Sequence, residues 1–289
     1  MVTGDDFGFS RGVNRAIIEA HERGVLTSAS LMVTGDAREE AVRLARAHPR
    51  LAVGLHLVVA SGKAVLPPEE IPHLVDPSGR FRSSPTRAGL AYQFRPAARA
   101  QLRREIRAQL ERFRETGLPL AHVDGHLHLH VHPVVLDVLA QLSAEFGIGT
   151  VRLPSEELGL ALELDGGGVA AKVLWSSVFG LLRRRGARRL QAAGVAVADR
   201  VYGLHHTGRV DERYLLSLVP RISAEWSEIY CHPALPLEGE PDNGPPGAGP
   251  VELAALLSPR VRAAIDAAGL VLAGSEEAAA LASARAHGR

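Results

Sequence analysis

The chain has 289 residues and a mass of 30.8 kDa, and 46% of its residues are hydrophobic, which is enough to bury one large core. Its 33 basic and 32 acidic residues give a formal net charge of +1, so overall charge gives no reason to expect a nucleic-acid partner. The single cysteine, Cys231, excludes an internal disulfide, and no apolar run reaches the ~18 to 20 residues of a membrane-spanning helix. The start shows no signal-peptide pattern and no Ser/Gly/Pro-rich linker divides the chain, so we expect one cytoplasmic domain over residues 1–289.

The N-terminal residues predict a strand followed by a helix. "MVTGDD" is typical of the end of a strand, and "SRGVNRAIIEAHERGV" of a helix with Ser10 at its N-cap and Gly24 just beyond its last turn. Asp5 and Asp6 cannot both point inward from a regular strand. We therefore expect the strand to end or to bulge at this pair.

Predicted strands and helices alternate along the rest of the chain. Further strands are expected at 28–33, 51–57, 120–126, 150–153, 200–204, 228–232 and 270–274. Helices are expected at 36–47, 97–116, 133–146, 170–193, 211–223 and 251–268. This order predicts an α/β fold, a (β/α) barrel of seven or eight parallel strands that need not be regular, with a doubly wound open sheet as the alternative. The Pro/Gly-rich segments near 58–94 and 233–250 are expected to be long substrate-binding loops.

The segment "HVDGHLHLHVHP", residues 122–133, contains five of the 13 histidines of the chain. Its histidines and its aspartate fall on one parity and its valines and leucines on the other, which predicts a half-buried strand with one polar face. Because a strand advances about 3.3 Å per residue, the first and fourth of the alternating histidines would lie roughly 26 Å apart, far beyond the bonds of one metal ion. Only one or two of these histidines can therefore bind the same metal.

Four polar clusters follow predicted strands, at the end of a (β/α) barrel where reactive groups lie. They are "GDDFG" with Asp5 and Asp6, "GLHL" with His56, "HVDGH" with His122, Asp124 and His126, and "YCHP" with His232. Two imidazoles and one carboxylate from three strands would form a metal site with open positions for water, an arrangement suited to hydrolysis. The second aspartate of the pair would then be free to act as a base.

Each cluster also has a purely structural interpretation. Asp5 and Asp6 are equally typical of a turn or a helix cap, and an isolated histidine such as His56 is more often a hydrogen-bonded core residue than a ligand. His232 would then be a side chain at a strand end, and the histidine-rich segment a solvated face. The convergence of all four clusters on one end of the same predicted barrel favours the functional interpretation.

Taken together, "TGDDFGFSRGVNRAIIEAHERGVLTSASLMV", "VGLHLV", "HVDGHLHLHVHP", "VRLP" and "EIYCHP" resemble the YdjC-like carbohydrate deacetylases, in order along most of the chain. Within that family, "VLPPEEIPHLVDPSGRF" and "AQLRREIRAQLERFRETGLPLAHV" are similar to the branch associated with hopanoid biosynthesis. That branch implies removal of acetyl from an N-acetylglucosaminyl hopanoid lipid, although Gly125 and Leu127 depart from its pattern.

The family resemblance implies a (β/α) barrel and one divalent ion, Mg or Zn, bound by Asp6, His56 and His126. It also implies metal-assisted amide hydrolysis, with Asp5 as the base and His232 as the acid. Four further polar residues of the matched segments, Asp124, His128, His130 and Arg152, are expected to bind substrate. The expected partner is an N-acetylated sugar or glycolipid, and a homodimer is also expected.

Three other functions fit some of these features. A soluble N-acetylglucosamine oligosaccharide is the alternative substrate. A phosphoesterase or amidohydrolase usually holds two ions about 3.5 to 4 Å apart, which needs more ligands than this set. A metal- or carbohydrate-binding module has no use for an uncoordinated carboxylate beside a ligand carboxylate.

Residues 169–194, "VAAKVLWSSVFGLLRRRGARRLQAAG", combine aliphatic and aromatic residues with five arginines. The simpler interpretation is a barrel helix with its apolar face packed inward and a solvated arginine end. The alternative is a partly exposed helix that contacts the inner face of the membrane, where apolar bulk beside arginines suits anionic headgroups.

Overall fold

The fold is built around one sheet of six parallel strands. The computed structural model describes residues 1–164 and 166–287, and within them the strand order is β4-β3-β2-β1-β6-β5. The strands are β1 (Val2–Phe7), β2 (Ser28–Leu31), β3 (Ala52–Leu57), β4 (Val123–Gly125), β5 (Arg200–Tyr202) and β6 (Ser227–Cys231). All five neighbouring pairs are parallel. Parallel strands joined by helices confirm the predicted α/β class.

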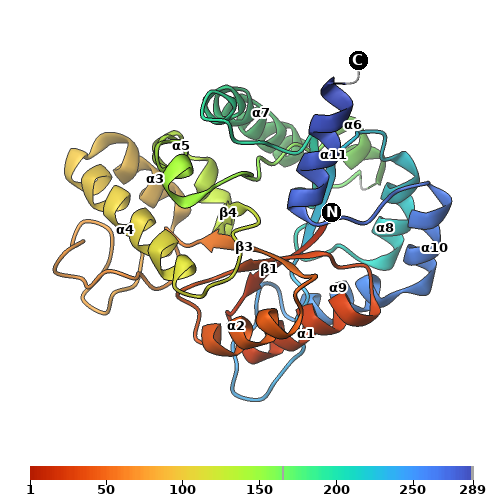
Figure 1. The fold of residues 1–289 in the computed structure, drawn as a ribbon, viewed down its shortest axis with the longest axis horizontal. Helices are drawn as coiled ribbons and strands as arrows, with labels where there is room; N and C mark the ends of the chain where they lie inside the picture. The colour runs from red at the N-terminus through yellow and green to blue at the C-terminus, as the bar shows by residue number, and fades with distance from the viewer. Residues whose placement is uncertain (165, 288–289) are drawn as a thin grey trace.

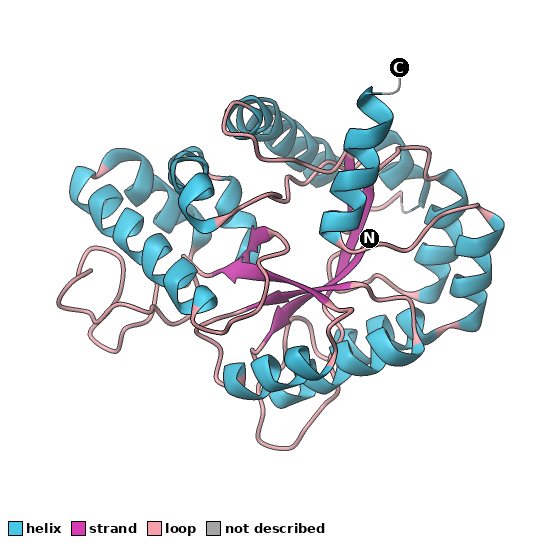
Figure 2. Cartoon of the chain, in the orientation of Figure 1, coloured by secondary structure: helices cyan, strands magenta, loops and turns pink. Residues whose placement is uncertain are grey.

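Helices surround the curved sheet (Figures 1 and 2). The α-helices are α1 (Arg11–Arg23), α2 (Arg38–Ala47), α3 (Pro85–Phe94), α4 (Pro96–Arg114), α5 (Pro133–Phe146), α6 (Leu158–Leu164), α7 (Val169–Gln191), α8 (Glu212–Leu218), α9 (Ala248–Leu257), α10 (Pro259–Ala267) and α11 (Ser275–His287). Two 3₁₀ helices, η1 (His126–Val131) and η2 (Val219–Arg221), complete the elements of the described residues. No helix of the described part of the chain is both long and apolar enough to cross a membrane.

The sheet forms an incomplete barrel. The segment 150–155 partly fills the gap between its edge strands β4 and β5. Val151 forms an isolated parallel bridge with Val123 of β4, and Ser155 an antiparallel bridge with Val201 of β5. The described residues therefore form fewer strands than the seven or eight that the sequence predicted. The segment 150–153 makes only isolated bridges, and 270–274 makes no strand.

The histidine-rich segment departs most from its prediction. Only Val123–Gly125 is a strand, and the following residues form η1 instead of continuing an extended polar face. Leu127 and His128 both have φ of 55°, which turns the chain away from the sheet. Pro133 then begins α5, with the His132 side chain accepting a hydrogen bond from the Val134 amide. The alternating polar and apolar residues therefore lie within a tight turn. Periodicity alone does not distinguish such a turn from a strand.

Local signals at helix ends gave better predictions. The Ser10 side chain caps α1 by accepting from the Val13 amide, and Gly24 follows the last turn, as expected. The expected helix 251–268 is instead two helices, because Ser258 and Pro259 end α9 and begin α10. Part of the expected loop 58–94 forms α3, whose N-cap is Ser84.

Candidate metal centre

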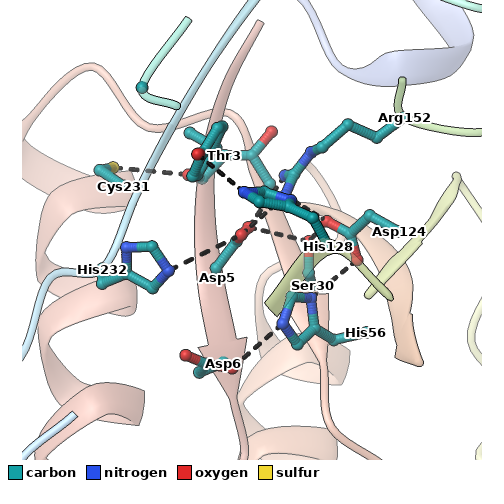
Figure 3. A network of polar contacts seen from close by, with 12 residues as sticks. Thr3, Asp5, Asp6, Ser30, His56, Asp124, His128, Arg152, Cys231 and His232 are labelled. Atoms are coloured by element: carbon teal, nitrogen blue, oxygen red, sulfur yellow. Dashed lines mark hydrogen bonds and ion pairs between the residues drawn. The ribbon is translucent and has the colours of Figure 1, made fainter. Parts of the chain in front are cut away.

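The candidate site lies at the carboxyl ends of β1, β3, β4 and β6, where four polar clusters were predicted to meet. In the sheet, His56 of β3 pairs with Asp124 of β4, and Gly4 of β1 pairs with Cys231 of β6. The next residues along β1 and β6 are Asp5 and His232. Parallel register therefore brings side chains from distant parts of the sequence into one cluster (Figure 3).

Asp6, His56 and His126 converge on one point. Asp6 Oδ1 lies 3.1 Å from His56 Nε2 and 3.0 Å from His126 Nδ1. One potential ligand atom from each of the three residues lies within 4.8 Å of the other two. This is the same group that the family resemblance implied as metal ligands. Asp6 and His56 are buried, whereas the His126 side chain is 17% exposed, so the cluster opens toward solvent on the η1 side.

The expected irregularity at the end of β1 is confirmed. The pairing of β1 with β2 shifts register between Gly4 and Phe7, and Asp6 adopts a φ of 62°. A non-glycine residue in this left-handed region is uncommon and carries a conformational cost. That backbone turn lets two consecutive carboxylates serve two different groups of partners.

The His56 ring is held from both sides by carboxylates. Its Nδ1 lies 2.8 Å from Asp124 Oδ1, while its Nε2 faces Asp6. Burial alone would lower the pKa of His56, but Asp124 and Asp6 together raise it well above its usual value. Burial alone would likewise raise the pKa of Asp6, but His126 and His56 lower it well below its usual range. A carboxylate behind a histidine is the arrangement that orients metal-binding imidazoles in other proteins.

Arg152 is fully buried and joins three carboxylates. Its guanidinium donates to both oxygens of Asp5, at 2.6 and 2.8 Å, and to Glu228 and Asp124 at 2.7 and 2.8 Å. The guanidinium also lies 4.8 Å from the centre of the Tyr230 ring. Bidentate pairing of this kind fixes the plane of the Asp5 carboxylate.

Asp5 and His232 form the second part of the site. Asp5 Oδ2 lies 4.0 Å from His232 Nε2, and Ser30 Oγ lies 3.3 Å from Asp5 Oδ1. The Asp5 side chain is buried, whereas the His232 side chain is 20% exposed. The backbone amide of His232 donates to the buried Glu252 at 2.5 Å, which anchors this strand end. Among the candidate ligands and the Asp5–His232 pair, His126 and His232 are thus the residues that solvent reaches.

The other histidines of the segment take positions around this centre. His122 Nε2 contacts Ser30 Oγ at 3.0 Å, His128 Nε2 contacts the Tyr230 hydroxyl at 2.8 Å, and His130 Nε2 donates to the Arg152 carbonyl at 2.8 Å. Burial lowers the pKa of His122, His128 and His130, so all three are neutral at pH 7.

His122 also explains a glycine in β3. A Cβ atom at Gly54 would lie 2.5 Å from the imidazole ring of His122. The ring therefore packs directly on the strand backbone at this position, and any larger residue would displace it.

The residues present fit a divalent cation. Four buried carboxylates, Asp5, Asp6, Asp124 and Glu228, surround the cationic Arg152 and the His56 ring. Buried negative charge in excess of positive charge is costly, so a bound cation would balance this cluster. Asp5, His56 and Asp124 form a second group of close ligand atoms. Arg152 already pairs with both carboxylates of that second group, which favours Asp6, His56 and His126 as the ligands.

The substrate-binding residues expected from the sequence lie mostly out of reach of solvent. Asp124, His130 and Arg152 are at most 1% exposed, because they lie beneath the metal-ligand cluster. His128 is partly exposed at the η1 turn. An open groove of about 1140 Å³ instead follows the loops after β1, β2 and β3, with Ser10, Thr34, Lys63 and Arg80 among its lining residues. This groove lies at the same edge of the sheet as the candidate site, and none of the candidate ligand residues lines it.

Sequence reasoning did not identify two partners of the site, Ser30 and Glu228. Ser30 Oγ lies 2.6 Å from Asp124 Oδ2, and Glu228 accepts from both Thr3 and Arg152. The available signal was the presence of polar residues in two predicted buried strands, "SASLMV" and "EIYCH".

Comparison with known proteins gives a consistent result. A family model described as "YdjC-like protein" matches residues 1–267. Proteins named "Carbohydrate deacetylase" are 37% identical in Geobacillus stearothermophilus, over 81% of this chain and 78% of that protein, and 32% identical in Homo sapiens, over 94% and 88%. The relative of the same name in Brevibacillus brevis is 44% identical, but the match spans 53% of this chain and 58% of that protein's length.

A solved structure shares the fold. The crystal structure of a protein from Enterococcus faecalis V583, described as a putative cellobiose-phosphate cleavage protein, superimposes with a TM-score of 0.73. It is 25% identical to this chain and covers 96% of it and 98% of its own length.

Proposed function

Because the chain belongs to the family of YdjC-like proteins, we propose that it is a metal-dependent hydrolase that removes the acetyl group from an N-acetylated amino sugar. The observation that carries this proposal is that two groups of residues lie next to each other at the same edge of the sheet. Asp6, His56 and His126 form a potential metal site, and Asp5 with His232 forms an acid–base pair beside it. Relatives named carbohydrate deacetylase support the same reaction.

Asp6, His56 and His126 would hold the ion, Mg or Zn. When bound, such an ion polarises the acetyl carbonyl and lowers the pKa of water. In our proposal Asp5 accepts the proton of the attacking water, since its carboxylate is held in place by Arg152 beside the candidate ligands. His232, at the exposed end of the pair, donates a proton to the departing amine nitrogen.

Asp124, His130 and Arg152 take a different role from the one that the sequence suggested. Their burial argues against direct contact with substrate, and we propose that they position the reacting residues. Asp124 orients the His56 ring, Arg152 orients Asp5, and His130 holds the backbone of Arg152. His128, beside the entrance, is kept as a candidate for substrate contact.

For the substrate we propose an N-acetylglucosaminyl lipid of the hopanoid type, processed in the cytoplasm or at the inner face of the membrane. Exposed apolar side chains close to the site support a lipid-linked sugar, among them Leu127, which follows His126 directly. A soluble N-acetylglucosamine oligosaccharide is the alternative that the same experiment measures. The predicted homodimer stays a prediction.

Acetate release from both substrate types would test the proposal. The chelated protein is reconstituted with Mg or Zn and incubated with N-acetylglucosaminyl lipids, with N-acetylglucosamine oligosaccharides and, as a control, with a phosphate ester. We expect acetate only after reconstitution, and none from the His126→Ala variant. Phosphate release without acetate release would refute deacetylation in favour of a phosphoesterase.

A further inference from the structure

Exposed apolar side chains are concentrated on three elements beside the site. Among the described residues, eleven large hydrophobic side chains are exposed, and nine of them lie on α3, η1 and α7. These nine are Leu90, Phe94, Leu127, Val169, Val173, Leu174, Trp175, Val178 and Leu181. Scattered exposed hydrophobics are ordinary on soluble proteins, but a concentration of this size on neighbouring elements marks an interaction surface. We call these nine residues the apolar rim.

The apolar rim borders the entrance to the candidate site. Phe179 of α7 packs its ring 5.9 Å from the ring of His128 in η1, and Tyr92 of α3 packs 6.3 Å from the ring of His132 just beyond η1. Both helices therefore flank the segment that carries His126. In Figure 1, α3, α5 and α7 lie along the upper margin of the view.

The half of α7 that carries most of the rim is poorly covered by the rest of the protein. Trp175 is 51% exposed and Leu181 is 70% exposed, and within the first three turns of the helix only Lys172 is buried. The C-terminal half, by contrast, packs on α5, where a Cβ at Gly186 would lie 2.8 Å from Leu136. The alternative interpretation of this segment, a partly exposed helix, therefore holds for its N-terminal half, whose apolar side chains do not all point into the core.

The two helices that carry most of the rim, α3 and α7, have charges of one sign. Residues 80–104, which include α3, contain seven arginines and no acidic residue, and α7 contains five arginines and one lysine and no acidic residue. The chain as a whole has nearly equal numbers of basic and acidic residues. Exposed arginines on both sides of the rim include Arg87, Arg95, Arg184, Arg185 and Arg188. A second copy of this chain would bring like charges together, whereas an anionic surface complements them.

We infer that α3, η1 and α7 dock the protein on an anionic lipid bilayer, with the apolar rim in the headgroup boundary and the arginines on the lipid phosphates. Apolar bulk and clustered arginines are also found in interfacial helices, and in α7 the two follow one another along the helix. The entrance beside His126 would then face the membrane. This inference does not depend on the acetylated sugar, because docking is measured without substrate.

Co-sedimentation with vesicles tests the docking directly. We expect binding to phosphatidylcholine vesicles that contain phosphatidylglycerol and little binding to phosphatidylcholine alone. The variant Arg184→Gln, Arg185→Gln, Arg188→Gln should lower the partition coefficient by about a hundredfold, given the contribution of each arginine near an anionic surface. Arg183 is left intact because it donates to the carbonyls of Leu153 and Ala198.

A matched control changes the same net charge elsewhere. Arg213→Gln, Arg221→Gln, Arg260→Gln replaces three exposed arginines on α8, η2 and α10, away from the rim, and should bind vesicles as the unchanged protein does. Equal losses in the two triple variants would reduce the effect to net charge and overturn the docking surface. Absence of binding to anionic vesicles would overturn it as well.

Tryptophan fluorescence separates the membrane from a second copy of the chain. The protein has two tryptophans, Trp175 in the rim and the buried Trp226, so a Trp226→Phe protein reports on Trp175 alone. We expect its emission to shift to shorter wavelength and to be quenched by brominated lipid when vesicles are added. If the shift occurs on raising protein concentration without lipid, together with dimer formation in light scattering, the rim is a self-association surface and the inference is wrong.

Discussion

Asp5 and Asp6 are neighbours in the sequence, yet their carboxylates face different partners. Asp6 faces His56 and His126, whereas Asp5 faces Arg152, Ser30 and His232. The left-handed φ of 62° at Asp6 separates the two side chains at the end of β1 (Figure 3). One strand end can therefore supply both a metal ligand and a base, a division of labour that a regular strand could not provide.

Replacing Asp5 with Asn should abolish turnover while metal content is retained. The amide is nearly isosteric with the carboxylate but cannot accept the water proton, and loss of a general base typically costs ~10² to 10⁴ in rate. Metal content is measured by elemental analysis and turnover by acetate release. Should Asp5→Asn lose the metal and Asp6→Asn keep it, the two roles would have to be exchanged.

Removing the imidazole of His126 should strip the metal without unfolding the protein. His126 is the ligand candidate that solvent reaches, so its truncation leaves no buried cavity. Calorimetric titration with Mg or Zn, supported by circular dichroism, measures both properties. His132→Asn is the matched control in the same segment, because it changes a histidine that contacts Tyr92 and lies outside the ligand group. Full metal occupancy in His126→Ala would contradict the assignment.

Metal affinity should rise with pH over a range that extends above the usual pKa of histidine, ~6.5. Asp124 and Asp6 overcome the effect of burial and raise the pKa of His56, so the metal-free protein holds a proton on this ring near neutral pH. Bound metal must displace that proton. Metal affinity therefore increases with pH until the pH exceeds the pKa of His56, where the ring is already neutral. Titrations at several pH values measure the slope. In Asp124→Asn the pKa of His56 falls, so the slope should move to lower pH, and an unchanged profile would show that His56 is not a ligand.

Arg152 should contribute to stability as well as to the orientation of Asp5. Arg152→Met leaves Asp5, Asp124 and Glu228 buried without their common partner, and breaking a buried ion pair by removing one side typically costs ~3 to 5 kcal/mol. Denaturant unfolding measures the loss. Arg184→Met, at an exposed position, is the control and should change the free energy of unfolding by less than about 0.5 kcal/mol. Similar losses in both variants would count against the buried network.

The sequence predicted the elements whose signals are local. The helix at 133–146 has the expected bounds, since Pro133 begins it and Gly147 follows its end with a φ of 67°. The histidine-rich segment was misread because alternation of period two also occurs in the tight turn at Leu127 and His128. The barrel was expected to have seven or eight strands, since short apolar runs such as 270–274 look like strands whether or not they find a partner.

The site was predictable to the extent that its residues are chemically distinctive. Aspartate and histidine after strands pointed to Asp6, His56 and His126 together with the family resemblance. Ser30 and Glu228 carry no such signal, and only the parallel pairing of β2 and β6 with β1 brings them to Asp5 and Arg152. The depth of Arg152 also depends on packing: an arginine at a strand end in the sequence is as compatible with a substrate contact as with the buried position it occupies.

His130 should make the metal-free protein less stable as the pH falls from ~6.5 to ~4. Burial lowers the pKa of His130 to about 4, while the unfolded chain titrates near ~6.5. Between these values the unfolded state binds the extra proton, so the free energy of unfolding decreases as the pH falls and levels off below ~4. The full difference corresponds to ~3 kcal/mol. Burial outweighs the opposing effects of Asp124 and of the hydrogen bond to the Arg152 carbonyl, and the Nδ1 atom of His130 has no hydrogen-bond partner among the described residues.

Urea unfolding of the chelated protein at pH 7 and pH 5 measures this dependence. His130→Asn should reduce the change in the free energy of unfolding between the two pH values by the contribution of one titrating group. Asn keeps an amide that can donate to the Arg152 carbonyl but has no titrating group in this range. His73→Asn, at an exposed position, controls for the loss of a histidine as such. His128 acts in the same direction, because burial also lowers its pKa well below the usual value, so some pH dependence should survive in His130→Asn. If the two asparagine variants show the same slope as the unchanged protein, His130 is protonated in the folded state and its proposed role beneath Arg152 must be abandoned.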